Sequence, residues 1–244
     1  MITQNVYESE ITSWESVAQS RWGSYISEIE KRAILKAQSI SREPSEAIEI
    51  GCEGGRWSKL LTNAGWKMTC VDINPKTLSL CQLRLPTARC VLVEPSASII
   101  PCDTRSLALM LCIEVNPVMP ESVWFIDEAC RVLRPGGMIV GTFLNLLSYR
   151  GLIAHFTAPF RGGADYFKFL YPVWRRKLRT RGFTFVHEEG FCWFPFRRAS
   201  NSALIPALTA AEECFGLRNV VSLSPWIVFV AQKGNGAVTN SFTQ

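Results

Sequence analysis

Short apolar runs alternate along the chain with segments whose apolar residues recur at helical spacing, most clearly in the first third. An apolar run at 47–50 breaks at a glycine cluster, residues 51–55. The next segment has apolar residues at helical spacing up to Gly65, and a second β-prone run, 68–71, ends at Asp72. This pattern predicts a strand, a glycine turn, a helix and a strand, which together make one βαβ unit.

The same alternation continues to residue 230. Further β-prone runs occupy residues 89–93, 106–113, 138–143, 183–186 and 226–230. Helices are expected from Pro75 onward, over 120–133 and 172–181, and around 203–215. The stretch 145–171 is rich in aromatic residues and follows neither period, so we expect it to be irregular. Strands that alternate with helices predict an α/β domain with a mainly parallel sheet.

The first 40 residues predict two packed helices. Apolar positions recur at helical spacing over residues 11–39, and Pro44 follows. This segment holds Trp14, Trp22 and Tyr25, and aromatic side chains commonly line small-molecule pockets. Two interpretations stay open, namely a helical pair that only packs on the domain and a lid that covers a ligand.

The glycine turn and the acid after the next strand predict a nucleoside-binding crevice. Glycines let the chain turn sharply after a strand and let a ligand approach the backbone. Asp72 lies 21 residues after Gly51, where a carboxylate can accept the hydroxyl protons of a ribose. The sequence departs from the nicotinamide pattern G-x-G-x-x-G because Glu53 takes the second glycine position. An NAD-dependent oxidoreductase is therefore the less favoured alternative.

Three short motifs stand in order between residues 45 and 145. Residues 49–55 read EIGCEGG, Asp72 ends the second expected strand, and residues 131–137 read RVLRPGG before the fifth. Together they resemble the E/D-x-G-x-G-x-G turn, the ribose-binding acid and the fifth-strand turn of class I S-adenosylmethionine-dependent methyltransferases of the small-molecule type. Glu53 departs from the family pattern, which usually has glycine there.

The resemblance implies a doubly wound, Rossmann-like, mostly parallel seven-stranded sheet with S-adenosylmethionine as the cofactor. It implies a methyltransferase domain over residues 45–233, an N-terminal helical lid over 1–44, a substrate-recognition insertion with its helix over 145–182, and a disordered tail at 234–244. Cofactor contacts are expected from Glu49, Gly51, Cys52, Gly55, Asp72, Ile73, Glu94 and Cys112. For Glu94, an ordinary polar turn is the alternative to an adenine contact.

Two side chains are candidates for the base that removes a proton from the acceptor. His155 lies in the aromatic insertion, and histidine titrates near neutrality. Glu114 ends the buried run of the fourth strand, at the edge where parallel sheets build their sites. Packing among neighbouring aromatic residues is the alternative role for His155. His187, beside two glutamates in an expected edge strand, is interpreted as a surface residue.

The net charge of +5 is distributed unevenly. Residues 146–200 hold ten Lys and Arg against three Asp and Glu, a balance of +7, which leaves −2 for the rest of the chain. The basic run 175–181 lies on an expected helix, and a solvated helix face explains such a run more often than nucleic acid does. Its aromatic neighbours fit a peripheral contact with a membrane surface better.

The nine cysteines are scattered through apolar segments without a C-x-x-C pair. We interpret them as small core residues in a reducing compartment, and we expect neither disulfides nor a metal site. No apolar run approaches the ~20 residues of a membrane span, and the polar N-terminus does not resemble a secretion signal. A cytoplasmic protein is expected, with peripheral membrane contact left open.

These features together predict methyl transfer from S-adenosylmethionine to a small, partly apolar acceptor. The expected acceptor group is a hydroxyl of a lipid-like, quinone-like or aromatic metabolite. The alternatives are a domain that binds S-adenosylmethionine without catalysis and an NAD-dependent oxidoreductase on a similar fold.

Overall fold

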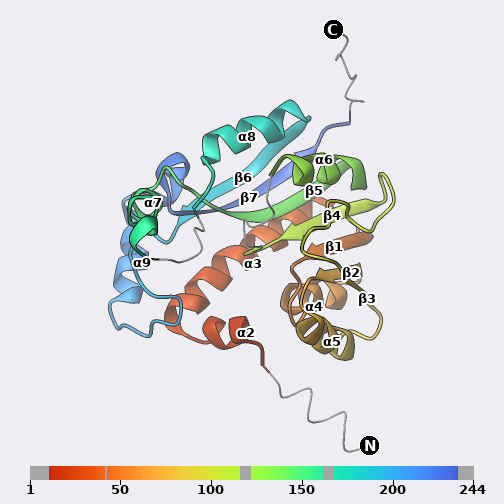
Figure 1. Cartoon of the computed structure of the whole chain (residues 1–244), viewed down its shortest axis with the longest axis horizontal. Helices are drawn as coiled ribbons and strands as arrows, with labels where there is room; N and C mark the ends of the chain where they lie inside the picture. Colours follow the sequence, from red (N-terminus) through yellow and green to blue (C-terminus); the bar gives the residue numbers. More distant parts are fainter. Residues whose placement is uncertain (1–10, 42, 116–121, 162–166, 236–244) are drawn as a thin grey trace, which may run out of the picture.

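A seven-stranded sheet in the order β3-β2-β1-β4-β5-β7-β6 forms the centre of the protein (Figure 1). The structure, a computed structural model, describes residues 11–41, 43–115, 122–161 and 167–235. The strands are β1 (Glu46–Ile50), β2 (Lys67–Asp72), β3 (Arg89–Leu92), β4 (Leu107–Cys112), β5 (Leu133–Leu144), β6 (Phe183–Phe191) and β7 (Trp226–Lys233). β1 to β5 pair in parallel, and β7 is antiparallel to both β5 and β6. The predicted mostly parallel, doubly wound sheet is confirmed.

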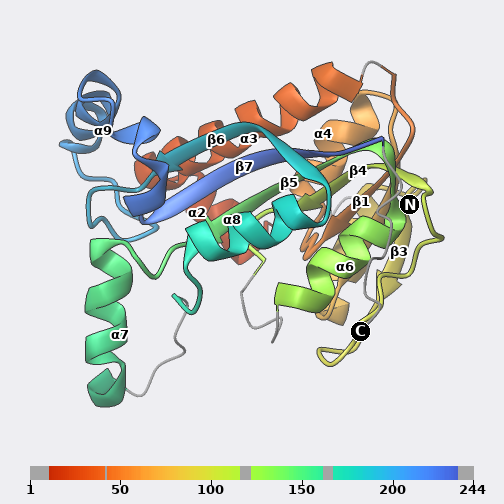
Figure 2. The ribbon, with the colours of Figure 1, turned by 90° about the horizontal axis from the view of Figure 1, so that it is seen from above.

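Helices cover both faces of this sheet (Figure 2). They are α2 (Ser13–Ala18), α3 (Arg21–Ser41), α4 (Arg56–Asn63), α5 (Pro75–Arg84), α6 (Ser122–Val132), α7 (Tyr149–Arg161), α8 (Tyr171–Thr180) and α9 (Ile205–Cys214). The core on one face includes side chains of α3, α4 and α5, and the core on the other includes side chains of α6 and α8. All six residues of β4 are buried between these layers, which explains its unbroken apolar run.

The predicted helix boundaries follow from local chemistry. Asn74 caps α5, because its side-chain oxygen accepts the Lys76 backbone N–H at 3.0 Å, and Pro75 opens the first turn. Gly182 follows α8 with a φ of 85° and donates its N–H to the Arg179 carbonyl at 3.0 Å. The expected N-terminal helical pair is present as α2 and α3, and residues 1–10 of the expected lid lie outside the described residues.

One expectation is wrong, because the stretch 145–171 is not irregular over its first half. It contains the 13-residue helix α7. Gly151 lies in the first turn of this helix, where Ser148 Oγ accepts its N–H at 3.0 Å. A Cβ at this position would lie 2.5 Å from the Asn145 carbonyl oxygen, so the chain needs glycine there to begin the helix.

The fifth strand begins five residues before its expected start. β5 pairs with β4 from Leu133, and the register then jumps from the Leu107–Leu133 pair to the Leu109–Met138 pair. The expected turn is therefore a bulge within the strand, with Gly136 at a φ of 76°. The preceding helix ends at Val132, and its expected opening residue, Pro120, lies outside the described residues. So do residues 236–244 of the expected tail. In the described parts of the chain, no helix is long and apolar enough to cross a membrane.

Candidate active site

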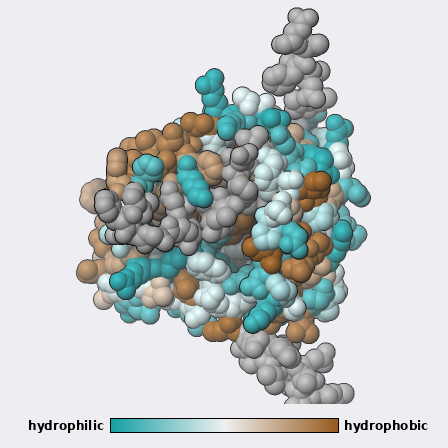
Figure 3. Space-filling view, viewed as in Figure 1, coloured by the Kyte–Doolittle hydropathy of each residue, from teal (hydrophilic) through white to brown (hydrophobic). Residues whose placement is uncertain are grey.

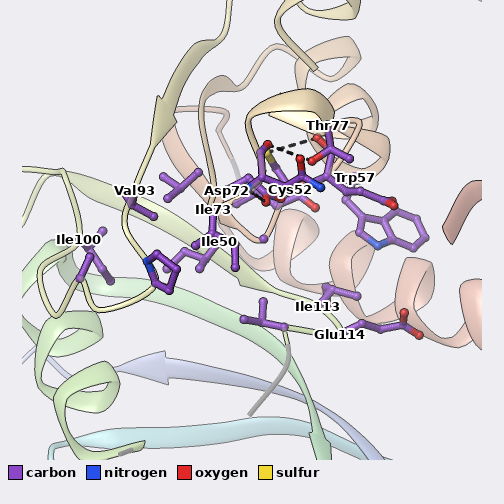
Figure 4. Close-up of a pocket in the computed structure, with 18 of the residues that line it drawn as sticks. Ile50, Cys52, Trp57, Asp72, Ile73, Thr77, Val93, Ile100, Ile113 and Glu114 are labelled. Atoms are coloured by element: carbon purple, nitrogen blue, oxygen red, sulfur yellow. Dashed lines mark hydrogen bonds between the residues drawn. The ribbon is translucent and has the colours of Figure 1, made fainter. Parts of the chain in front are cut away.

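A cavity of about 580 Å³ opens at the carboxyl ends of β1, β2 and β4. β1 lies between β2 and β4, so connections leave it on opposite sides and a crevice forms beyond its end. The walls come from the glycine turn, the end of β2, the segment 93–101, the end of β4 and the start of α2. Figure 4 shows Val93 and Ile100 at one end of this cavity and Trp57 and Glu114 at the other.

The glycine turn after β1 is held by hydrogen bonds to the neighbouring strand. The backbone N–H groups of Gly51 and Cys52 both donate to the Val71 carbonyl, at 2.8 and 3.1 Å. Gly51 has a φ of 69°, in the left-handed region that favours glycine. A Cβ there would also lie 3.1 Å from a Val115 methyl carbon. The turn is therefore fixed against β2 and leaves its backbone open to the cavity.

The Asp72 carboxylate lines the cavity and is held there by two backbone hydrogen bonds. Its Oδ2 accepts the Glu53 backbone N–H at 2.7 Å, and its Oδ1 accepts the Asn74 N–H at 2.8 Å. A carboxylate oxygen can accept more than one hydrogen bond, so both oxygens can still accept from a ligand. Two backbone donors thus hold the carboxylate at the end of β2, where a pair of ribose hydroxyls would meet it.

Glu53, which stands where the family has glycine, connects the turn to α2. Thr12 Oγ1 donates to Glu53 Oε2 at 2.8 Å, and the Trp14 backbone N–H donates to Oε1 at 3.4 Å. Burial raises the pKa of Glu53. Beside it, Arg84 forms an ion pair with Glu15 of α2 at 2.7 Å. These contacts hold the start of α2 against the cavity, and Trp14 is one of its lining residues.

Carboxyl groups dominate the polar lining. Among the described lining residues, the acids are Glu49, Glu53, Asp72, Glu94 and Glu114, and the cationic side chain is Arg56. Glu49 is buried, and burial raises its pKa to about 8 despite hydrogen bonds from the Ser58 N–H and hydroxyl. Trp57 also lines the cavity, and its indole N–H has no hydrogen-bond partner among the described residues. The lining is therefore suited to a positively charged ligand.

Glu114 lies at the end of β4 with a strained backbone. Its φ is 53°, and its N–H donates to Thr142 Oγ1 at 2.6 Å. Arg198 lies 3.3 Å from Glu114 Oε2 and stacks on Trp14 at 3.9 Å and on Trp226 at 4.6 Å. Glu30 of α3 is fully buried beside this group, and burial, followed by the charge of Glu114, raises its pKa well above the usual range.

Comparison with known proteins identifies the enzyme class. A family model described as a methyltransferase domain matches residues 48–141. A ubiquinone biosynthesis O-methyltransferase of Chromobacterium violaceum is 29% identical over 187 residues, which cover 69% of this chain and 79% of that protein. The chain is an S-adenosylmethionine-dependent methyltransferase. This result confirms the enzyme class predicted from the three motifs.

Two further similarities describe how far the likeness reaches. A phthiotriol/phenolphthiotriol dimycocerosates methyltransferase of Mycobacterium leprae is 31% identical over 103 residues, which cover 41% of this chain but only 38% of that protein. A crystal structure of an S-adenosylmethionine-dependent methyltransferase from Mesorhizobium loti superimposes with a TM-score of 0.58 at 13% identity, covering 81% of this chain and 96% of that one. At such identity the structural likeness shows the fold alone.

The methyltransferase cavity brings together most of the site residues predicted from sequence. Glu49, Gly51, Cys52, Asp72, Ile73, Glu94 and Glu114 all line it. Gly55 and Cys112 do not: Gly55 begins α4 in the left-handed conformation, and the Cys112 thiol is buried and donates to the Val140 carbonyl at 3.3 Å. His155 is exposed on α7, in an edge-to-face contact with Phe156, and is not among the lining residues.

Several lining residues of the methyltransferase cavity carry no clear signal in the sequence. Trp57 follows the glycine turn, and its place on α4 offers only a core interpretation. Ile99 is 70% exposed in a loop and lines the cavity with Ile100, so an apolar pair in a polar loop is the available signal. Arg198 is not a lining residue but pairs with Glu114, which lies 84 positions away, and no local pattern joins the two.

Proposed function

We propose that this methyltransferase transfers a methyl group from S-adenosylmethionine to a hydroxyl of a small, partly apolar acceptor. The observation that carries the proposal is the acidic cavity at the strand ends, with Asp72 held by two backbone N–H groups on its floor. A sulfonium cofactor that carries a ribose matches both properties. The phosphates of a dinucleotide would face five carboxyl groups, so the same lining disfavours NAD.

The residues present fit this cofactor. A cavity of about 580 Å³ falls within the usual range for ligands of this size. Asp72 would accept the ribose hydroxyl protons, and Glu49 and Glu53 would face positive charge, which would lower the cost of ionising these partly or fully buried carboxyl groups.

The start of α2 supports the proposed lid. Ser13 and Trp14 line the cavity, and Glu53 ties this segment to the glycine turn through Thr12. A cover that excludes water strengthens the electrostatic contacts in a site and prevents side reactions. The glutamate at the usual glycine position would thus serve to hold the lid.

Within such a site the chain has to align the acceptor and receive its proton. S-adenosylmethionine supplies a methyl group that its sulfonium already activates. Glu114 lines the cavity and could accept a hydroxyl proton on its carboxylate, while Arg198 balances the charge of that carboxylate. Such a base contributes about 10²–10⁴-fold in rate. His155 remains the alternative base, although it would have to move from its exposed position on α7 to reach the cavity.

An apolar acceptor is supported by the surface next to α7. Leu152, Ile153 and Phe156 of this helix are exposed, Phe156 by 72%. Figure 3 shows apolar residues gathered at the upper left, over the region where Figure 1 places α7. The names of the relatives refer to ubiquinone biosynthesis and to phthiotriol lipids, which are apolar molecules. Acceptors of this kind partition into membranes, so peripheral contact of α7 with a lipid surface is part of the proposal.

Calorimetry tests the cofactor assignment. Asp72→Ala should weaken S-adenosylmethionine binding by ~1–3 kcal/mol, because buried ribose hydroxyls lose their acceptor. Asp103→Ala is the matched control, since this exposed aspartate is not a lining residue. Equal affinity of Asp72→Ala and the parent would contradict the assignment, provided that circular dichroism shows both folded.

A panel of acceptors tests the reaction. Isotopically labelled S-adenosylmethionine is incubated with phenols, catechols, quinols and long-chain alcohols, with polar amines and RNA as the contrasting classes. Label on the oxygen of an apolar acceptor supports the proposal. Activity confined to amines or RNA overturns the acceptor class while leaving the cofactor assignment standing.

A further inference from the structure

Four of the nine cysteines gather beneath the glycine turn. The Sγ atoms of Cys52, Cys70 and Cys81 all lie within 4.8 Å of one another, and all three residues are buried. They come from the glycine turn, β2 and α5, so the cluster joins three separate elements. Cys90 of β3 is the register partner of Cys70 in the neighbouring parallel strand.

The spacing of these sulfurs suits a single metal ion. Three atoms no more than 4.8 Å apart share a point that lies within about 2.8 Å of each, against about 2.3 Å for a zinc–sulfur bond. Side-chain shifts of roughly 0.5 Å would therefore complete three bonds of the length that thiolates make to zinc. Cys90 is only partly buried and packs against the same core, but its sulfur is not within 4.8 Å of all three others, so it would have to move further than they do to supply a fourth sulfur.

The surroundings leave room for this cluster and a route to it. Gly55 has no side chain, and a Cβ there would lie 2.7 Å from the Cys81 sulfur, closer than atoms approach. Cys52 lines the cavity, so an ion can reach the sulfurs through it. Ser58 Oγ accepts the Cys70 thiol proton at 3.1 Å and also donates to Glu49, so Cys70 is oriented by its neighbours.

From this geometry we propose a metal site made by Cys52, Cys70 and Cys81, with Cys90 as the fourth ligand, for a thiophilic d¹⁰ ion of the Zn²⁺ or Cu⁺ class. Soft thiolate sulfurs select these ions over hard cations such as Mg²⁺. The bound ion would hold the glycine turn to β2 and α5, in addition to the backbone hydrogen bonds to Val71 and the hydrogen bond from Arg84 to the Gly54 carbonyl. This proposal goes beyond the expectation that the cysteines serve only as core residues.

Cadmium serves as the probe, because cadmium–thiolate bonds absorb in the ultraviolet. The full chain is reduced, freed of metal with a chelator and titrated with Cd²⁺ without oxygen. The band should saturate at one ion per chain. Cys52→Ala and Cys81→Ala should each weaken binding by at least the ~10–100-fold that loss of a supporting contact costs. Cys214→Ala, in an exposed residue, and Cys192→Ala, in a buried one outside the cluster, are the controls and should bind like the parent.

A second measurement does not depend on variants that fold. The ¹¹³Cd resonance of the loaded parent reports how many sulfurs bind the ion, and three or four sulfurs support the site. Nitrogen or oxygen donors, or a band that Cys214→Ala weakens as much as Cys52→Ala does, overturn it. A chain that carries a disulfide within the cluster and binds no ion after reduction also overturns it. Parallel titrations with Zn²⁺ and Cu⁺ against competing chelators then identify the preferred ion.

Discussion

The strands β1, β2 and β4 and the strand β5 end in different ways at the same edge of the sheet. The first three lead into turns that line a cavity with carboxyl groups. β5 leads to Asn145, which is buried and whose side-chain amide is hydrogen-bonded through both its nitrogen and its oxygen. Its amide nitrogen donates to the Ser222 and Ser224 carbonyls at 2.8 and 3.2 Å, and its oxygen accepts the Tyr171 N–H at 3.1 Å. The ends of β1, β2 and β4 therefore expose polar groups to a cavity, whereas the polar group at the end of β5 is hydrogen-bonded within the protein.

Packing shows the same division. The half that contains β5, β6 and β7 has a group of touching aromatic rings, in which Trp174 contacts Phe229 at 4.7 Å and Phe143 at 5.2 Å between ring centres. The half that contains β1 to β3 has the glycine turn and the cysteine cluster instead. Substitutions in the aromatic half should therefore act mainly on stability, and substitutions around the cavity should act mainly on binding and turnover.

The largest expected effect is on stability, and it comes from comparing a tryptophan-to-alanine substitution in each half. Trp174→Ala should lower the free energy of unfolding by ~3–5 kcal/mol, because it empties a buried aromatic site, while cofactor affinity stays unchanged. Trp14→Ala should weaken cofactor binding and leave the free energy of unfolding nearly unchanged, because the Trp14 side chain is 40% exposed and lines the cavity. Urea unfolding and calorimetry measure the two quantities. Equal loss of stability in both variants would remove the distinction between the halves.

The next effect concerns turnover and separates the two candidate bases. Glu114→Gln keeps the shape of the side chain but removes the proton acceptor, so turnover on a hydroxyl acceptor should fall by ~10²-fold or more with cofactor affinity preserved. His155→Ala, outside the cavity lining, should keep most of its turnover at saturating acceptor. If His155→Ala loses the activity and Glu114→Gln keeps it, α7 supplies the base and moves during the reaction.

A smaller effect is expected at Glu53. Glu53→Gly restores the family pattern but removes the acceptor of Thr12 and of the Trp14 N–H, so S-adenosylmethionine should bind ~0.5–1.5 kcal/mol more weakly. Hydrogen exchange over residues 11–18 should rise in the same variant. Glu53→Gln is the matched control, since its amide oxygen can still accept from Thr12. Tighter cofactor binding by Glu53→Gly would show that the glutamate opposes the cofactor instead of holding α2 over it.

The smallest expected change is on the surface of α7. Phe156→Ser should alter the free energy of unfolding by no more than ~0.5 kcal/mol, because the ring is already exposed. The KM for an apolar acceptor should rise severalfold, while the affinity for S-adenosylmethionine stays the same. Leu35→Ser, in an exposed leucine on α3, is the control and should change neither value. An unchanged KM in Phe156→Ser would contradict the proposal that the apolar surface of α7 binds the acceptor.

Local chemistry makes the half with the cavity predictable from sequence. A glycine at positive φ and an acid at a strand tip are properties of a few consecutive residues, so the sequence alone locates Gly51 and Asp72 in the site. The start of α7 is not predictable in this way, because Gly151 weakens a helix in isolation and only the approach of the Asn145 carbonyl makes it necessary. The pairing of Arg198 with Glu114 and the meeting of the cysteines depend on distant segments that the sheet brings together.

Arg198 stands between the two halves, stacked on Trp14 and Trp226 and paired with Glu114. A ligand that draws Trp14 inward changes the contacts of this guanidinium, and an acceptor that engages Glu114 changes them from the other side. The two binding events are then thermodynamically linked, and the linkage must be reciprocal: whatever factor the cofactor imposes on acceptor affinity, the acceptor imposes on cofactor affinity. Such a linkage would rest on a single arginine stacked on two indole rings.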